Sequence, residues 1–261
     1  MSTTKLRVAT WNILADSLCT DDDQGFPFSS PEERDPHRRA RLQYKILAQQ
    51  KAEVIALQEV DDIDRLQPFL EAMGYAVQYT QRETAVLGTV LAVKKTLLII
   101  FSRIELPDDR QLNTAMLDVE GRRVIVATTH LKAKAEGEES RKRQIARILE
   151  ASNVTPCILL GDFNDTPDSP CIREMANAGF ASAIDGPDSQ PVFPFTTMKK
   201  RKGPDGQTMT VSRVEDYIFF KGLKLASSQL ELPERVNFAS LPTKYYPSDH
   251  LLLKAEFHLN H

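Results

Sequence analysis

The segment Leu159-Leu-Gly-Asp-Phe-Asn164 is a hydrophobic run that ends in a carboxylate and an amide. On an extended chain, alternation puts Asp162 and Asn164 on one face and turns Phe163 toward the core. A carboxylate beside an amide can orient a water molecule while accepting its proton, as general-base chemistry requires. The alternative is an ordinary turn after a buried strand, which this segment alone does not exclude.

Three further segments also end an apolar run with an acid, an amide or an imidazole. They are Val8-Ala-Thr-Trp-Asn12, Ile55-Ala-Leu-Gln-Glu59 and Pro247-Ser-Asp-His250. Any one of them could be a plain strand end, but four with the same ligand chemistry indicate one shared site. Oxygen donors of this kind suit Mg²⁺ or Mn²⁺ rather than Zn²⁺. The sequence therefore predicts metal-assisted hydrolysis of a phosphate ester.

Composition excludes several other classes of protein. The 261 residues are 41% hydrophobic and 26% charged, which is typical of a globular chain with a sizeable core. A formal charge of −3 argues against a protein coated in nucleic acid, although a local basic groove stays open. The 3 cysteines are an odd number without a C-x-x-C pair, so they predict a reducing compartment rather than a disulfide framework.

No apolar run approaches the roughly 18 residues of a membrane span, so no membrane partner is expected. Met1-Ser-Thr-Thr-Lys5 leads directly into the first strand-like run, which predicts no signal or transit peptide. We therefore expect a cytoplasmic protein.

Strand-like and helical patterns alternate along the chain and predict an α/β fold. The helical patterns cover residues 36–50, with Asp35 as N-cap and Leu42, Ile46 and Leu47 on the inner face, and also residues 63–73, 138–152 and 170–178. The strand-like runs cover residues 6–14, 54–60, 86–93, 97–101, 113–119, 123–129, 157–160, 214–220, 223–230 and 251–257. No Gly/Ser linker or repeat divides the chain, so a single domain over residues 1–261 is the simplest organisation.

Two histidines also stand at strand ends. His130 closes Ile125-Val-Ala-Thr-Thr129, where a lone histidine is more often structural than catalytic. Asp249 and His250 are adjacent and should face opposite ways on a strand, so that Asp249 faces the metal and His250 the reacting phosphate. Asp216 is a candidate to hold the His250 imidazole in one tautomer.

These motifs together resemble the endonuclease/exonuclease/phosphatase superfamily. The resemblance rests on Trp11-Asn-Ile-Leu-Ala15, Leu57-Gln-Glu-Val60, Thr129-His-Leu-Lys132, Gly161-Asp-Phe-Asn164, Asp216-Tyr-Ile218 and Ser248-Asp-His250. The motifs occur in the family's order and are most similar to the branch of nocturnin and the carbon-catabolite-repressor type deadenylases. The resemblance implies a β-sandwich of two sheets with helices on both outer faces, a DNase-type four-layer sandwich.

The resemblance also implies a role for each site residue. Glu59 would be the principal ligand of Mg²⁺ or Mn²⁺, helped by Asn12 and Asp249. Asp162 would activate the water, and Asn164 would orient that water or the phosphate. His130 and His250, the latter oriented by Asp216, would stabilise charge on the phosphoryl oxygens.

Basic residues near two motifs bear on the substrate. Lys132 and Lys134 follow His130, and Lys199 and Arg201 lie in a segment that resembles a phosphate-binding segment of nocturnin; the alternative is a solvated charged loop. Met198 replaces a usual tryptophan there, which leaves substrate identity open.

Three functions remain. The first is removal of a phosphate from a nucleotide, such as the 2′-phosphate of NADP(H). The second is 3′ exonuclease, deadenylase or 2′,3′-cyclic phosphate hydrolase activity on RNA ends. The third is a catalytically silent module that binds nucleotide or RNA. The expected substrate is thus a phosphorylated nucleotide or an RNA 3′ end, not DNA, and the expected state is a monomer.

Overall fold

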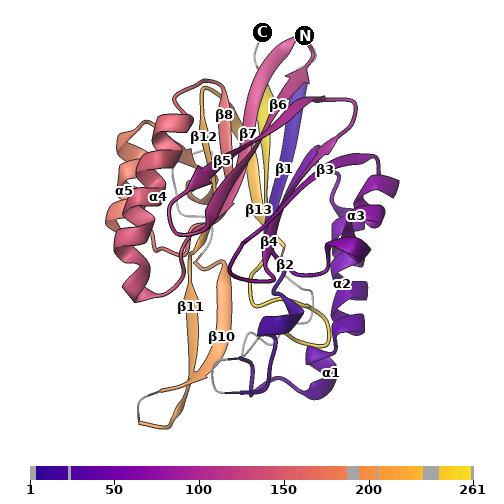
Figure 1. The fold of residues 1–261 in the computed structure, drawn as a ribbon, viewed down its shortest axis with the longest axis vertical. Coiled ribbons are helices and arrows are strands. Elements are labelled where there is room, and N and C mark those ends of the chain that lie inside the picture. Colours follow the sequence, from indigo (N-terminus) through magenta and orange to yellow (C-terminus); the bar gives the residue numbers. More distant parts are fainter. Residues whose placement is uncertain (1–3, 23–24, 187–193, 204, 232–240, 260–261) are drawn as a thin grey trace.

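A computed structural model describes residues 4–22, 25–186, 194–203, 205–231 and 241–259. Two six-stranded sheets face each other, and helices cover the outer face of each (Figure 1). Helices α1, α2 and α3 lie on one side, and α4 and α5 on the other. The predicted four-layer sandwich is therefore confirmed. Among the described residues, no helix is long and apolar enough to cross a membrane.

The first sheet has the strand order β13-β14-β1-β2-β4-β3. Its strands are β1 (Thr4–Asn12), β2 (Val54–Val60), β3 (Tyr75–Gln81), β4 (Gly88–Lys94), β13 (Lys224–Leu230) and β14 (Leu253–Leu259). Strands β1 and β2 are parallel, with Asn12 beside Gln58, so the two chains leave the sheet at the same edge. Strand β14 runs antiparallel to β1 and starts at that edge, because Leu253 pairs with Thr10.

The second sheet has the strand order β5-β6-β7-β8-β12-β9. Its strands are β5 (Leu98–Leu106), β6 (Arg110–Val119), β7 (Arg122–His130), β8 (Cys157–Asp162), β9 (Ala181–Ser182) and β12 (Asp216–Lys221). Parallel pairing sets His130 beside Asp162, and antiparallel pairing sets Asp216 on the other side of Asp162. His130, Asp162 and Asp216, on three adjacent strands, therefore lie side by side across the sheet.

The helices end close to where the sequence predicts. They are α1 (Pro31–Arg34), α2 (Pro36–Gln49), α3 (Ile63–Ala72), α4 (Glu138–Ala151) and α5 (Pro170–Asn177). The Asp35 side chain accepts from Arg38 N and caps α2, and Gly74 takes φ +85° after α3. Short α1 is not among the predicted helices; the Ser30–Glu33 capping box supports its single helical turn.

The predicted inner face of α2 is wrong in part. Its buried residues are Arg39, Gln43 and Leu47, whereas Leu42 and Ile46 are only half-buried. The reason is that polar groups lie under this helix: the Gln43 side chain donates to the carbonyl of Ile13. A hydrophobicity pattern cannot locate a helix face whose partners are backbone carbonyls.

A projecting hairpin is the largest departure from the predicted elements. Strands β10 (Thr197–Lys202) and β11 (Thr208–Arg213) form a separate two-stranded sheet that extends away from the sandwich (Figure 1). The sequence predicts only a charged segment there, because lysine and arginine are poor indicators of a strand. The hairpin is anchored at its base, where Met198 N donates to the carbonyl of Asp249.

Candidate active site

Asp162 is the centre of the candidate site and is 1% exposed. It ends β8 directly after Gly161, whose φ is +145°. A Cβ at Gly161 would lie 2.1 Å from the carbonyl oxygen of Thr129, so only glycine allows β7 and β8 to approach this closely. The glycine thereby determines where the Asp162 carboxylate lies.

Four partners surround the Asp162 carboxylate. The Asn12 Nδ2 donates to its Oδ2 at 3.0 Å, and the Asn164 backbone N–H donates to its Oδ1 at 2.8 Å. His130 Nε2 lies 3.5 Å and His250 Nε2 3.9 Å from Oδ2. These residues come from segments up to 238 positions apart, yet they meet around one buried acid.

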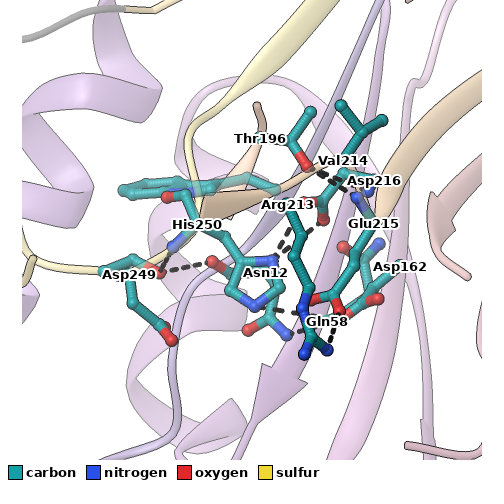
Figure 2. A network of polar contacts seen from close by, with 12 residues as sticks. Asn12, Gln58, Asp162, Thr196, Arg213, Val214, Glu215, Asp216, Asp249 and His250 are labelled. Atoms are coloured by element: carbon teal, nitrogen blue, oxygen red, sulfur yellow. Dashed lines mark hydrogen bonds and ion pairs between the residues drawn. The ribbon is translucent and has the colours of Figure 1, made fainter. Parts of the chain in front are cut away.

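His250 is held by Asp216 on its far ring nitrogen. Nδ1 lies 2.9 Å from Asp216 Oδ2 and 3.2 Å from Oδ1, and Asp216 is fully buried. Although burial disfavours the imidazolium, the carboxylates of Asp216, Asp249 and Asp162 raise the pKa of His250 well above its usual value. His250 is therefore a cation at neutral pH, and its Nε2–H is directed toward Asp162 (Figure 2).

His130 has the opposite protonation state. Burial and the positive charges of Arg82, Arg110 and His250 lower the pKa of His130 well below its usual value. An Arg82 guanidinium nitrogen lies 2.9 Å from His130 Nδ1, so the neutral ring accepts from Arg82 and keeps its proton on Nε2. A neutral and a charged imidazole thus flank the same carboxylate, as in sites that separate acid and base roles by environment.

The pKa of the Asp162 carboxyl group is also shifted. Burial raises the pKa of the carboxyl well above its usual range, against the opposing charge of His250. The nearby acids Asp216 and Glu215 raise it further. Only the ionised Asp162 carboxylate can accept a proton. A cation beside Asp162 would favour this ionised form.

Glu59 lies at a distorted position of β2. The pairing of β2 with β4 shifts register between Leu57 and Val60, and Glu59 takes φ +56°. A bulge of this kind re-aims a side chain, and positive φ at a non-glycine residue is typical of functional sites. Among the described residues, the Glu59 side chain accepts one hydrogen bond, from Ala15 N at 3.3 Å. Its remaining lone pairs are available to a ligand.

Asp249 faces away from His250, toward the hairpin. The two carboxylates Asp249 and Asp216 lie on opposite sides of His250 (Figure 2). Lys199 Nζ lies 3.2 Å from Asp249 Oδ2. Although burial opposes it, Lys199 and His250 lower the pKa of Asp249, which is therefore ionised.

A cation has a suitable set of donors here. Within the described residues, the acids and histidine close enough to share one ion are Asp162, Asp216 and His250, with ligand atoms within 4.8 Å of one another. His250 and Asp216 neutralise each other as an ion pair, so they are poor ligands. Asn12 contacts Asp162 directly, and Asn12, Asp162 and Glu59 carry hard oxygen donors of the kind that Mg²⁺ prefers. The chemistry of the site thus fits a divalent metal.

The predicted basic residues are distributed unevenly. Lys199 reaches the site through Asp249, and Arg201 Nη1 donates to the carbonyl of Gly25 at 3.1 Å. Lys132 and Lys134 lie beyond His130 with exposed side chains that pair with no other described residue. Lys199 is therefore the basic side chain that the described contacts join directly to a predicted site residue.

Sequence reasoning missed Arg82 and Arg110. Arg82 follows β3 directly, so a strand-exit pattern at Gln81-Arg82 could have found it. Arg110 is 7% exposed, its Nε has no partner among the described residues, and burial together with Arg82 lowers its pKa to about 10. No sequence signal marks Arg110, because it opens β6 directly after the acidic turn of Asp108 and Asp109.

Two known proteins are similar to nearly the whole chain. Nocturnin of Rattus norvegicus is 29% identical over 292 residues, which cover 98% of this chain and 66% of that protein. Human 2′,5′-phosphodiesterase 12 is 25% identical, covering 95% of this chain and 51% of that protein. The chain thus spans less than two thirds of the length of either relative.

Solved structures show the same fold. The human Nocturnin catalytic domain with bound sulfate superposes with a TM-score of 0.74 at 26% identity, covering 97% of this chain and 93% of that one. ANGEL2, a 2′,3′-cyclic phosphatase, in complex with adenosine-2′,3′-vanadate gives a TM-score of 0.80 at 20% identity, covering 98% and 96%, which shows the fold alone. The model of the Endonuclease/Exonuclease/phosphatase family matches residues 9–250. The chain belongs to this family.

Proposed function

We propose that this chain is a divalent-metal-dependent hydrolase of phosphate esters. The observation that carries the proposal is the buried Asp162 carboxylate, with Asn12, His130 and His250 around it. An acid in this setting can accept a proton from water, and the surrounding donors can stabilise negative charge on a phosphoryl group. One convergent set of side chains therefore supplies both requirements of the reaction.

Each residue has a definite part in this proposal. Asp162 accepts the proton of the attacking water, which Asn164 orients. His250, kept charged by Asp216, and His130, which donates from Nε2, stabilise the phosphoryl oxygens. Glu59 and Asn12 would hold Mg²⁺ or Mn²⁺, and Asp249 would join them if its carboxylate left Lys199 on metal binding; when bound, the ion supplies a Lewis acid for the phosphate oxygens.

The first candidate substrate is a small phosphorylated nucleotide, such as NADP(H), from which the 2′-phosphate is removed. Similarity to Nocturnin over nearly the whole chain supports it, as does the excess positive charge at one edge of the site. Arg82 and Arg110 lie together beside His130, and neither bonds a carboxylate among the described residues. Such a pair would favour a compact substrate with several phosphates.

The second candidate is the 3′ end of an RNA, including poly(A) or a 2′,3′-cyclic phosphate. The observation that favours it is the projecting hairpin. Strand β10 carries Lys199, Lys200, Arg201 and Lys202, β11 ends in Arg213, and neither strand carries an acid. A basic arm joined to the site could contact the backbone of a longer strand.

A phosphate- and nucleotide-release assay distinguishes these candidates. The purified chain is incubated with Mg²⁺ or Mn²⁺ and NADP(H), poly(A), cyclic-phosphate RNA ends or a DNA oligonucleotide, with Asp162→Asn as the matched inactive control. Free phosphate from NADP(H) without RNA shortening supports the first candidate. Nucleoside monophosphates released from RNA support the second, and binding without turnover of any substrate would show a silent binding module.

Salt dependence gives a second, independent discrimination. If RNA is the substrate, Lys200→Ala with Lys202→Ala should flatten the slope of log affinity against log salt by about 1.4, because each phosphate contact on a single strand contributes about 0.7. Lys224→Ala on β13 is the matched control, since it is exposed but outside the hairpin. An unchanged slope would argue for the small substrate.

We also propose that the chain acts as one catalytic domain and as a monomer. A continuous hydrophobic core with residues from both sheets supports a single folding unit. Sedimentation at micromolar concentration, with one cooperative unfolding transition, is the expected result.

A further inference from the structure

Arg39 is a buried arginine that the proposed chemistry does not use. It lies in the first turn of α2 and is 1% exposed. Arginine is seldom fully buried unless its donors are all engaged, because an unpaired buried guanidinium is costly. The partners of Arg39 therefore indicate what it is buried for.

Every nitrogen of the Arg39 guanidinium has a partner. Nε donates to the carbonyl of Pro247 at 2.8 Å, and Nη1 contacts Asp16 Oδ1 at 2.5 Å. Nη2 donates to the carbonyl of Ile13 at 3.1 Å and to that of Leu14. Three of these partners are backbone carbonyls, and they belong to two segments at opposite ends of the chain.

The first segment is the turn that follows β1. Leu14 takes φ +59°, a conformation that costs free energy for a leucine unless its surroundings hold it. The same turn directs two backbone N–H groups at site residues: Leu14 N donates to Asn12 Oδ1 at 3.0 Å, and Ala15 N donates to Glu59 Oε2 at 3.3 Å. Arg39 thus binds the backbone carbonyls of this turn. The backbone N–H groups of the same turn orient Asn12 and Glu59.

The second segment leads into β14 and carries His250. Pro247 precedes Ser248, whose hydroxyl donates to the carbonyl of Asn12 at 2.7 Å and accepts from His250 N at 3.1 Å. Trp11 Nε1 donates to the carbonyl of His250 at 2.8 Å. The end of β1 with its following turn and the segment before β14 therefore contact each other directly, and Arg39 adds a second link between them.

We propose that Arg39 is a positioning residue that fixes the turn after β1 against the segment before β14. This inference rests on the proposed function, because its consequence is that Asn12, Glu59 and His250 keep their places in the proposed site. The planar guanidinium group is required, since it must donate to the carbonyls of Pro247 and Ile13 at the same time. A lysine ammonium is a single point and cannot span both segments.

The test compares Arg39→Lys with Arg38→Lys. Arg38 is the matched control because it lies in the same turn of α2 and donates to the carbonyl of Lys244, in the segment before β14. Arg39→Lys should lower kcat by about 100-fold with KM changed less than threefold, because a displacement near 1 Å at a reacting centre has about this effect. Arg38→Lys should leave both constants within about threefold.

A second readout needs neither substrate nor metal. The chain has 1 tryptophan, so a ¹H–¹⁵N spectrum contains a single indole resonance, from Trp11, whose N–H bonds to His250. This resonance should shift or broaden in Arg39→Lys and stay in place in Arg38→Lys. If Arg39→Lys fails to fold, Asp16→Asn, which weakens one anchor of Arg39, should reproduce the indole shift and lower kcat in the same direction.

The inference is overturned if either readout of folded Arg39→Lys matches that of Arg38→Lys, or if Asp16→Asn leaves both unchanged. An inactive wild-type chain would instead contradict the proposed function, and the indole resonance would still decide the role of Arg39.

Discussion

Replacing Asp216 by asparagine tests the electrostatic design of the site most directly. The substitution keeps the shape of a fully buried side chain and removes the charge that contacts His250 Nδ1 at 2.9 Å. A hydrogen bond to a charged group contributes about 1.5–3 kcal/mol, and each 1.4 kcal/mol of transition-state stabilisation is a factor of about ten. The expected loss in kcat/KM at neutral pH is therefore about 10- to 100-fold.

The pH profile provides the sign of the effect. Because the folded pKa of His250 is raised above 6.5, the imidazolium is retained as pH rises, and activity that needs it is lost only as pH passes the folded pKa. Without the Asp216 charge the pKa is lower, so this basic limb should move to lower pH. The stabilisation that the ion pair gives the fold follows the same rule: it is complete below the unfolded pKa and lost above the folded one.

The assay is a profile of kcat/KM against pH for wild type and Asp216→Asn, with thermal unfolding at each pH as the control for folding. Asp185→Asn is a suitable control variant, since Asp185 is an exposed acid and is not among the carboxylates that raise the pKa of His250. A basic limb at the same pH in wild type and Asp216→Asn would refute the reasoning, because it would mean that Asp216 does not maintain the charge on His250.

Three further outcomes are expected. Mg²⁺ at 100 times its Kd should stabilise the folded state by about 2.7 kcal/mol and so raise the Tm by about 5–11 °C. A thermal-shift titration should show this increase in the wild type and its loss in Glu59→Gln. Asp162→Asn should lower kcat by about 10²- to 10⁴-fold while leaving the Tm unchanged or higher, since burial already disfavours the ionised acid and the amide carries no charge; a marked fall in Tm would contradict that account. Gly161→Ala should destabilise the fold by more than about 3 kcal/mol in urea unfolding, because its Cβ would meet Thr129 O at 2.1 Å, and a change below 1 kcal/mol would show that β7 and β8 can separate.

Local patterns predicted most of the elements and several of their ends. The Asp35-Pro36 pair predicted the start of α2, and Val54–Val60 was predicted residue for residue, because caps and uninterrupted apolar runs act over a few neighbouring positions. The hairpin of β10 and β11 was not predicted, because its strands are mostly polar, are buried only at the base of β10, and are formed by pairing with each other.

The sequence by itself determined which chemical groups this protein offers: acids, amides and imidazoles that end hydrophobic runs, in an order that identifies the family. Tertiary structure alone decided their relations. It set a neutral His130 and a charged His250 around Asp162, because those protonation states depend on Arg82 and Asp216, which are remote in sequence. It also buried Arg39 on a helix face where the hydrophobic pattern predicts leucine and isoleucine. The physical reason is that burial and charge act through space, whereas periodicity records only neighbours along the chain.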